Sequence, residues 1–412
     1  MKHRLLFGSL PLMALFLTLA PVAMASNTWY VDGVNGNDDN NCKSPQTACK
    51  TIGHAISLAS SGDAIKVAPA TYTENLTISI SLKILGADAS TTIVDGNEAG
   101  TVVTISSSSA VVALSELTIQ NGSAQYGGGI NNSGTLTVKD TTITSNTAYF
   151  VCTDDCEGGG GGIYNGGTLT VKNTTITSNT ANFGCTAGCG DLGGGIFNSG
   201  TLTVNKSTIG GNSVSGFCGK PGCGALGGGI FNWGTLTVNN ATINGNSATC
   251  RGYCENWGGG VSNGIPYHNG TLAINNSTIS GNSAAQGGGI YNNDGAVVLQ
   301  NSIVANSTSG GNCWGTMTSN GYNLSDDNSC NFGGTGDYND TKPELGKLGY
   351  HGGPTQTIPE LKGSITVDHG NPSGCTDSQG HLLTTDQRGY PRPGAHKTHK
   401  ICDMGAYERQ TD

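Results

Sequence analysis

"GGGIYNGGTLTVKNTTITSNTA", residues 160–181, is the stretch that decides the fold, because the chain repeats it. Close copies begin at positions 127, 193 and 227, and looser copies begin at 258 and 287. The aliphatic residue after each Gly run recurs every 29 to 34 residues, as Ile130, Ile163, Ile196, Ile230, Val261 and Ile290. Self-similarity at a nearly fixed period of this length is typical of a repeat protein, in which each unit packs on the next.

Each unit contains three short β-prone segments, which read "GGGIxN", "TLTV" and "TTIT" in the close copies. The middle segment alternates apolar and polar residues, so Leu136 and Val138 face one side of a strand and Thr137 faces the other. Every unit runs in the same direction, so like segments stack as parallel strands in register. The sequence therefore predicts an all-β fold, a right-handed parallel β-helix (a solenoid) with three sheets around one core.

The repeat also places like residues above one another along the predicted helix. Three aliphatic columns are expected to fill the core: Leu136, Leu169, Leu202, Leu236 and Leu272; Val138, Val171, Val204, Val238 and Ile274; and Ile143, Ile176, Ile209, Ile243, Ile279 and Ile303. Two columns of Asn are expected to bond amide to amide between coils: Asn132, Asn165, Asn198, Asn232, Asn263 and Asn292; and Asn146, Asn179, Asn212, Asn246, Asn282 and Asn306. The repeated phrase is thus mostly scaffold.

The chain divides into three parts. Residues 1–25 combine a basic start, an apolar stretch and Ala23-Met24-Ala25, which together fit a secretory signal peptide. Residues 26–310 are expected to form the β-helix, with about six repeats and a short amphipathic N-terminal capping helix around Ile52 and Ile56. Residues 311–412 are expected to form an irregular C-terminal capping region.

Composition limits the partners and the location. The formal charge of −9 and the scattered Lys and Arg residues argue against a nucleic-acid partner. After the signal peptide, no apolar run is long enough to span a membrane. The sequence therefore predicts a secreted protein, extracellular or at the cell surface.

The 14 cysteines fall in neighbouring pairs, as expected for disulfides in an exported chain. The pairs are Cys42/Cys49, Cys152/Cys156, Cys185/Cys189, Cys218/Cys223, Cys250/Cys254, Cys313/Cys330 and Cys375/Cys402. The second to fifth pairs occupy the same slot of consecutive repeats, so their loops should project from one edge of the helix. Pairing within each loop is favoured, although coils about 4.8 Å apart would also allow disulfides between neighbouring loops.

Two stretches carry a family resemblance. "WYVDGVNGNDDNNCKSPQTACKTIGHAISLASSGDAIKVAPATYTENLTI" resembles the first coils of bacterial right-handed β-helix proteins of the pectate-lyase-like superfamily. The ending, with Asp386-x-Arg388-Gly389, Arg392 and Cys402-Asp403-x-Gly405-Ala406-x-Glu408, resembles a choice-of-anchor Q C-terminal domain. The resemblance implies a surface or secreted protein. In the tail, Asp386, Arg388, Arg392 and Asp403 are expected to form an ion-pair network that closes the last coil.

A catalytic site in such a helix would need carboxylates stacked on successive coils, either to hold Ca²⁺ or to serve as acid and base. Between Gly127 and Gly310 no acid occupies the same repeat position on two successive coils outside the Cys loops. A dedicated polyuronate lyase site is therefore disfavoured, and no catalytic residue is assigned. No cofactor is expected, except that Asp154, Asp155 and Glu157 in the loop "CTDDCE" could bind Ca²⁺, although solvated loop acids are commoner.

The Cys loops also contain aromatic residues, which are expected to be exposed: Tyr149, Phe150, Phe183, Phe217, Tyr253 and Trp257. Stiff loops with aromatics along one edge suit a binding surface, and an aromatic ring can stack on a sugar face. Covering the helix edge is the competing structural role. The sequence thus favours a non-catalytic adhesion or glycan-binding scaffold with a polysaccharide or cell-surface glycan as partner. The alternative is an extracellular polysaccharide lyase or glycoside hydrolase.

Overall fold

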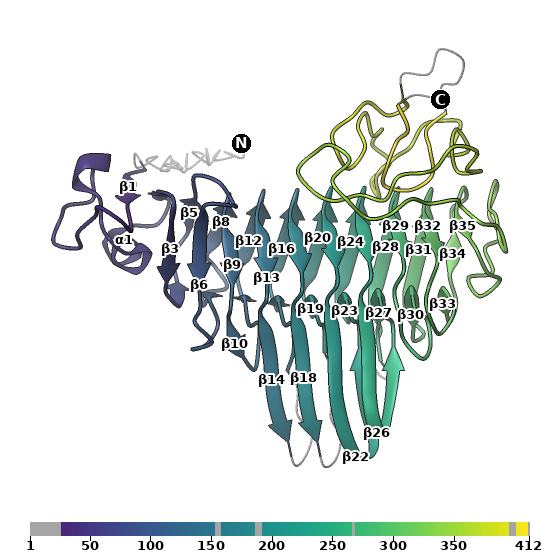
Figure 1. The fold of residues 1–412 in the computed structure, drawn as a ribbon, viewed down its shortest axis with the longest axis horizontal. Helices are drawn as coiled ribbons and strands as arrows, with labels where there is room; N and C mark the ends of the chain where they lie inside the picture. Colours follow the sequence, from purple (N-terminus) through teal and green to yellow (C-terminus); the bar gives the residue numbers. More distant parts are fainter. Residues whose placement is uncertain (1–25, 153–157, 186–191, 266–267, 395–400, 411–412) are drawn as a thin grey trace, which may run out of the picture.

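The chain winds into a solenoid of parallel strands, seen from the side in Figure 1. This computed structural model describes residues 26–152, 158–185, 192–265, 268–394 and 401–410. The predicted signal peptide, residues 1–25, therefore lies outside the described residues. Among the residues described, no helix is long and apolar enough to cross a membrane.

Three long sheets form the solenoid, as predicted. Sheet A contains β1 (Thr28–Val31), β2 (Ala64–Val67), β5 (Leu82–Leu85), β8 (Val111–Ser115), β12 (Thr135–Lys139), β16 (Thr168–Lys172), β20 (Thr201–Asn205), β24 (Thr235–Asn239), β28 (Thr271–Asn275), β31 (Ala296–Gln300) and β34 (Thr318–Ser319). Sheet B contains β3 (Ala70–Thr73), β6 (Thr92–Asp95), β9 (Thr118–Gln120), β13 (Thr142–Thr144), β17 (Thr175–Thr177), β21 (Thr208–Gly210), β25 (Thr242–Asn244), β29 (Thr278–Ser280), β32 (Ile303–Ala305) and β35 (Leu324–Ser325). Sheet C contains β4 (Leu76–Ile78), β7 (Val103–Ile105), β11 (Ile130–Asn132), β15 (Ile163–Asn165), β19 (Ile196–Asn198), β23 (Ile230–Asn232), β27 (Val261–Asn263), β30 (Ile290–Asn292) and β33 (Cys313–Trp314).

The aliphatic columns fill the core between these sheets. Leu202, for example, pairs in register with Leu169 on one side and Leu236 on the other, and all three are buried. The Ile column was wrong at its last member, because Ile279 pairs with Val304 rather than Ile303. Ile303 instead packs in a separate cluster with the C-terminal region.

The Asn columns form hydrogen-bonded ladders, also as predicted. Asn165 Nδ2 donates to Asn198 Oδ1 at 2.7 Å, and the same bond repeats from Asn132 through Asn263 with Asn292 as the last acceptor. The second ladder runs from Asn146 to Asn282, with 3.0 Å between neighbouring amides. Asn306 is not part of it: it is exposed and contacts Ser280 instead.

A fourth sheet was not predicted. Sheet D, here called the fin, consists of β10 (Ser123–Ala124), β14 (Thr147–Cys152), β18 (Thr180–Cys185), β22 (Ser213–Leu226) and β26 (Ser247–Trp257). It is the Cys-loop edge of the sequence, and it projects from the lower side of the solenoid in Figure 1. The Gly runs let the chain return from the fin into the coil, because a Cβ on Gly161 would lie 2.4 Å from the carbonyl oxygen of Thr180.

A short helix covers the N-terminal end of the core. The helix α1 (Ile52–Leu58) follows a 3₁₀ turn, η1 (Pro45–Thr47), and Thr51 caps it by accepting from the backbone N–H of His54. Ile52 and Ala55 are buried against the first coil. The predicted capping helix is therefore present at the expected place.

The C-terminal region, residues 341–394 and 401–410, lies along the outer face of sheet B (Figure 1, yellow). Thr208 donates to the carbonyl of Gln356, and Thr242 Oγ1 donates to Gln387 at 2.7 Å. The C-terminal region therefore covers the side of the solenoid over several coils, instead of closing the last coil as expected.

The predicted ion-pair network forms with one change of partner. Arg388 pairs with Asp386 at 2.7 Å, and Arg392 lies 2.9 Å from Glu408, with all four side chains buried. Asp403 accepts backbone N–H groups of Asp368 and Arg409 instead of pairing directly with an arginine. Buried pairs of this kind fix geometry more than they add stability.

Five of the predicted disulfides lie within the described residues, and all five join the expected neighbours: Cys42–Cys49, Cys218–Cys223, Cys250–Cys254, Cys313–Cys330 and Cys375–Cys402. In these pairs the bond forms within a loop and not between coils. The remaining predicted pairs involve Cys156 and Cys189, which lie outside the described residues.

Candidate functional site

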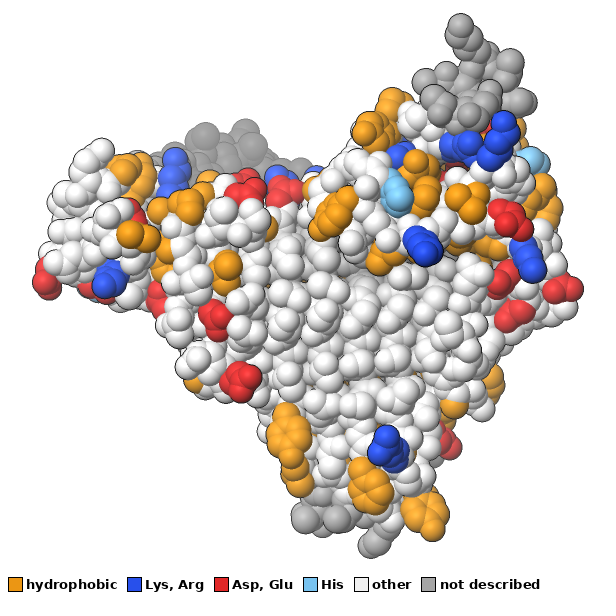
Figure 2. Space-filling model, in the orientation of Figure 1, with side chains coloured by type: hydrophobic (Ala, Val, Ile, Leu, Met, Phe, Trp, Pro, Cys, Tyr) orange, Lys and Arg blue, Asp and Glu red, His pale blue; other side chains and the backbone are white. Residues whose placement is uncertain are grey.

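The fin carries exposed aromatic side chains: Tyr149 and Phe217 lie on one face of the sheet, and Tyr253 lies where the register of β22 and β26 is interrupted. Tyr149, Phe217 and Tyr253 have exposed fractions of 55%, 58% and 67%. Val151 and Arg251 occupy the same row as Phe217 on successive strands. Figure 2 shows hydrophobic side chains, with basic atoms among them, on the lower projection of the molecule. We call the surface formed by Tyr149, Val151, Phe217, Arg251 and Tyr253 the fin face. Small and polar residues of the neighbouring strands lie between these side chains.

The other three aromatic residues of the Cys loops do not belong to this face. Phe150 and Phe183 were wrongly expected to be exposed: only 5% and 4% of their surfaces are accessible. They stack at 6.4 Å between ring centroids inside the fin. Trp257 is half-buried and stacks on Tyr291 at 4.7 Å.

The interior of the fin is a second hydrophobic core, separate from that of the solenoid. It joins Phe150 and Phe183 to small residues and to the loop cysteines Cys218 and Cys223. Gly216 lies in register with Phe183, and a Cβ there would lie 2.5 Å from the Phe183 ring. The disulfides and this packing make the fin a stiff support for its exposed aromatic residues.

Sequence reasoning missed an aromatic column on the outer face of sheet C. Tyr164, Phe197 and Phe231 follow the core Ile of successive repeats, and their rings lie 4.8 and 5.4 Å apart. Ser262 interrupts this column, and a second stack follows in which Tyr291 lies between Trp257, at 4.7 Å, and Trp314, at 4.6 Å. The variable position of "GGGIxN" is Tyr or Phe in four of the six copies, and this is the signal that could have revealed the column. Most of this column is buried, and it packs with Leu226 and Trp257, the last residues of the fin strands β22 and β26.

A second candidate site is an acidic groove where the turn between sheets A and B meets the C-terminal region. The cavity has a volume of about 380 Å³. Asp88, Glu116 and Asp140 line it from the solenoid, and Tyr350 and Pro354 line it from the C-terminal region. Figure 2 shows acidic and basic side chains along this upper edge, whereas the central face of the solenoid is largely uncharged.

Glu116 and Asp140 stand at the same position of successive coils, because Ser115 and Lys139 before them are paired in register. The pair does not show in the repeat pattern, because Glu116 lies before the first close copy of the repeat, which begins at Gly127. Both residues adopt a left-handed backbone conformation, with φ of 57° and 49°, which marks the tight turn between the two sheets.

The charges in the groove are partly paired. Lys139 Nζ lies 2.6 Å from Asp140, and this hydrogen bond raises the pKa of the Lys139 ammonium, with a further contribution from Glu116. Asn173 Nδ2 donates to the other oxygen of Asp140 at 3.0 Å. The groove thus offers the neighbouring carboxylates of Glu116 and Asp140, and the Lys139 amine is paired with Asp140 beside it. Such groups can bind sugar hydroxyls or transfer protons.

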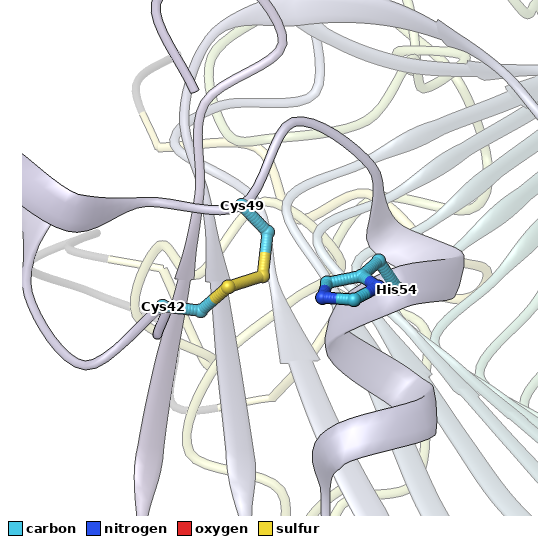
Figure 3. Close-up of side chains that lie close together, drawn as sticks. All are labelled: Cys42, Cys49 and His54. Carbon is cyan, nitrogen blue, oxygen red and sulfur yellow. A yellow bond between two sulfur atoms is a disulfide. The ribbon is translucent and has the colours of Figure 1, made fainter. Parts of the chain in front are cut away.

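Within the part of the chain that the structure describes, one group of three metal-ligand side chains converges: Cys42, Cys49 and His54 (Figure 3). The two cysteines form a disulfide, and a disulfide sulfur lacks the thiolate charge that binds metals. The predicted Ca²⁺ ligands Asp154, Asp155 and Glu157 lie outside the described residues, so that site stays a prediction.

Comparison with solved structures identifies the fold. The chain is similar to the pectate lyase Pel9A, with 14% sequence identity, a TM-score of 0.51, and coverage of 94% of this chain and 98% of that one. The protein has a pectate-lyase-like right-handed parallel β-helix. A lacto-N-biosidase from Eubacterium ramulus (10% identity, TM-score 0.36, 73% and 64% coverage) and a rhamnogalacturonan lyase (12%, 0.36, 83% and 97%) are more distant. No protein-family model and no curated protein matches the chain, so the resemblance to a choice-of-anchor Q domain stays a prediction.

Proposed function

We propose that the protein is an extracellular carbohydrate-binding β-helix, and that the fin face holds the glycan. The observation that carries this proposal is the exposure of Tyr149, Phe217 and Tyr253 on a disulfide-stiffened support whose own core is already filled. Aromatic rings presented to solvent on a stiff support suit stacking against a sugar face. Among the described residues that define the fin face, Arg251 carries the one charge, so we propose a neutral polysaccharide as the ligand.

The five disulfides are consistent with an oxidising, extracellular location, which is where such a glycan would be met. Pel9A is named as a polysaccharide-cleaving enzyme, but at 14% identity this likeness supports the fold only. The carbohydrate assignment therefore depends on the aromatic face itself.

Binding to insoluble and immobilised neutral polysaccharides tests the proposal. Tyr149→Ala, Phe217→Ala and Tyr253→Ala should each weaken retention about tenfold, and the triple variant should abolish it. Leu382→Ala, which removes an exposed apolar side chain from the C-terminal region, is the matched control and should bind as the natural chain does. Retention of the triple variant on the same glycan would refute the fin face as the binding surface.

A second candidate function is glycan cleavage in the acidic groove. The observation that favours it is the pair Glu116 and Asp140 on adjacent coils, with Lys139 as a basic neighbour. Such a constellation could supply the acid and base of a hydrolase or the base of a lyase.

Product formation separates this second candidate from the first. New reducing ends and unsaturated products should be measured over a panel of neutral and acidic polysaccharides, with Ca²⁺ and with chelator. If cleavage occurs, Glu116→Gln and Asp140→Asn should each lower its rate at least about a hundredfold, while Asp294→Asn should not. Binding without turnover would leave the first proposal standing alone.

A further inference from the structure

One disulfide of the fin is accessible to solvent, unlike the other four that the structure describes. Cys250 and Cys254 are both partly exposed. Every cysteine of the other four described disulfides is at most 4% exposed. The sulfurs of Cys250 and Cys254 lie 3.6 and 3.2 Å from the carbonyl oxygen of Arg251, and both contacts are at the surface. Because an attacking thiolate must reach a disulfide sulfur, access distinguishes this bond from the others.

The bond lies in the part of the fin that projects away from the solenoid. Figure 1 shows β22 and β26 extending to the tip of this projection. One edge of β26 pairs with β22. Along the other edge, the described residues form bridges only at the two ends of the strand, from Ser247 to Ser283 and from Trp257 to Gln286. The edge between these bridges is therefore open to a molecule that approaches Cys250 and Cys254.

The disulfide closes a loop that contains two residues of the fin face. Arg251 and Tyr253 lie between the two cysteines, and both side chains are exposed. Cys250 and Cys254 themselves pack only against the margin of the fin core. The register between β22 and β26 is interrupted where this loop turns. The disulfide is thus the link that keeps the loop closed, while pairing with β22 holds the rest of the strand.

We propose that Cys250–Cys254 is a site of thiol–disulfide exchange with an external dithiol, and that reduction releases the loop carrying Arg251 and Tyr253. One thiolate of the dithiol attacks a protein sulfur, the Cys250–Cys254 bond breaks, and a mixed disulfide forms. The second thiol of the reagent then displaces that protein sulfur. The dithiol is oxidised to a disulfide, and two electrons and two protons pass to Cys250 and Cys254, which become thiols.

The expected consequence is confined to the tip of β26, because the buried bond Cys218–Cys223 on β22 stays intact. A released loop no longer holds Tyr253 in one position, and ordering it again opposes binding. The fin face should therefore hold its glycan more weakly in the reduced protein. This consequence rests on the proposed function, whereas the exchange itself does not.

Limited reduction of the folded protein with dithiothreitol tests the exchange. New thiols are trapped by alkylation at successive times and located by mass spectrometry. Cys250 and Cys254 should be labelled at least about tenfold faster than any cysteine of the other four described disulfides. Labelling of Cys218 and Cys223 at an equal or greater rate would overturn the proposal. This measurement uses the natural chain, so it does not depend on the folding of any variant.

Trypsin tests the release of the loop, because Arg251 lies inside it. Cleavage after Arg251 should occur in the reduced protein and not in the oxidised protein. The double variant Cys250→Ser/Cys254→Ser should be cleaved there without reductant. The matched control Cys42→Ser/Cys49→Ser, which removes a disulfide of the N-terminal region, should be cleaved there only after reduction. Cleavage after Arg251 that does not depend on the redox state would contradict the proposal.

Glycan retention separates the failure of this inference from the failure of the proposed function. On a glycan that the oxidised protein binds, the protein reduced only at Cys250–Cys254 should bind at least about threefold more weakly. Unchanged retention after this reduction would overturn the link between the bond and the fin face. If the oxidised protein binds no glycan, the proposed function fails, and the labelling and cleavage experiments still decide whether exchange releases the loop.

Discussion

In the solenoid core, each coil offers the next coil an identical residue in register, as Leu169, Leu202 and Leu236 do. The fin is built differently. Its long strands contain 6, 6, 14 and 11 residues, and their register shifts between Cys218 and Cys223. Inside it, aromatic rings and disulfide cysteines pack beside a column of small aliphatic residues, Ala148, Ala181, Val214 and Ala248.

The comparison suggests that the solenoid and the fin differ in how they unfold. Uniform coils stabilise one another through every neighbour, so the solenoid should unfold as one cooperative unit. The fin is attached at its base and has its own small core, so it should open locally at a lower free-energy cost. The fin strands differ in length from coil to coil, whereas the coils beneath them keep their register.

The largest effect is expected from a cavity in the solenoid core. Leu202→Ala should lower the free energy of unfolding by about 3 kcal/mol, because neighbouring coils cannot collapse into the space. Phe183→Ala removes a larger side chain, yet it should shift the global urea midpoint less while raising protease sensitivity in the fin. Equal global shifts in the two variants would contradict the division between the regions.

The next largest loss of unfolding free energy is expected from a break in the Asn ladder. Asn198→Ala removes a side chain that donates to Asn232 Oδ1 and accepts from Asn165 Nδ2, so the buried Asn232 oxygen loses this donor and the ladder is broken. The expected loss is about 2–3 kcal/mol of unfolding free energy. Thr201→Ala, at an exposed position in the same coil, serves as the control and should change stability by less than about 0.5 kcal/mol.

A smaller effect is expected from a fin disulfide. Replacing Cys218 and Cys223 together by Ser opens a five-residue loop, worth about 2 kcal/mol on the chain-entropy estimate. Hydrogen exchange should accelerate in β22 and its neighbours and stay unchanged in sheet A. A similar acceleration in sheet A would show that the fin and the solenoid unfold together.

The smallest effect should come from pH. Burial raises the pKa of Glu360 and brings that of Glu408 to about 7. A carboxyl group whose pKa is higher in the folded chain than in the unfolded chain destabilises the fold as the pH rises through the folded-state value. The melting temperature should therefore be lower at pH 8.5 than at pH 6, and the decline should be smaller in Glu360→Gln. A melting temperature that rises with pH would contradict these shifts.

The outer face of sheet B contains equivalent residues whose burial the repeat does not predict. Thr142, Thr175, Thr208 and Thr242 occupy one column on its outer face, and nothing in the repeat separates them. The first two remain partly exposed, whereas Thr208 and Thr242 are buried under the C-terminal region. The tail makes these contacts with residues 145 to 148 positions away, by hydrogen bonds that follow no period.

The sequence by itself determined the parallel β-helix, its inward columns, its Asn ladders and the pairing of the loop cysteines that the structure describes. These features could be read because the contacts of one coil with the next recur at a fixed spacing. Only the tertiary structure decided that Phe150 and Phe183 fill a fin, that the tail lies along sheet B, and that Glu116 and Asp140 share a groove with Tyr350. Those features arise where unlike segments meet, and the burial of a side chain there depends on which segment covers it.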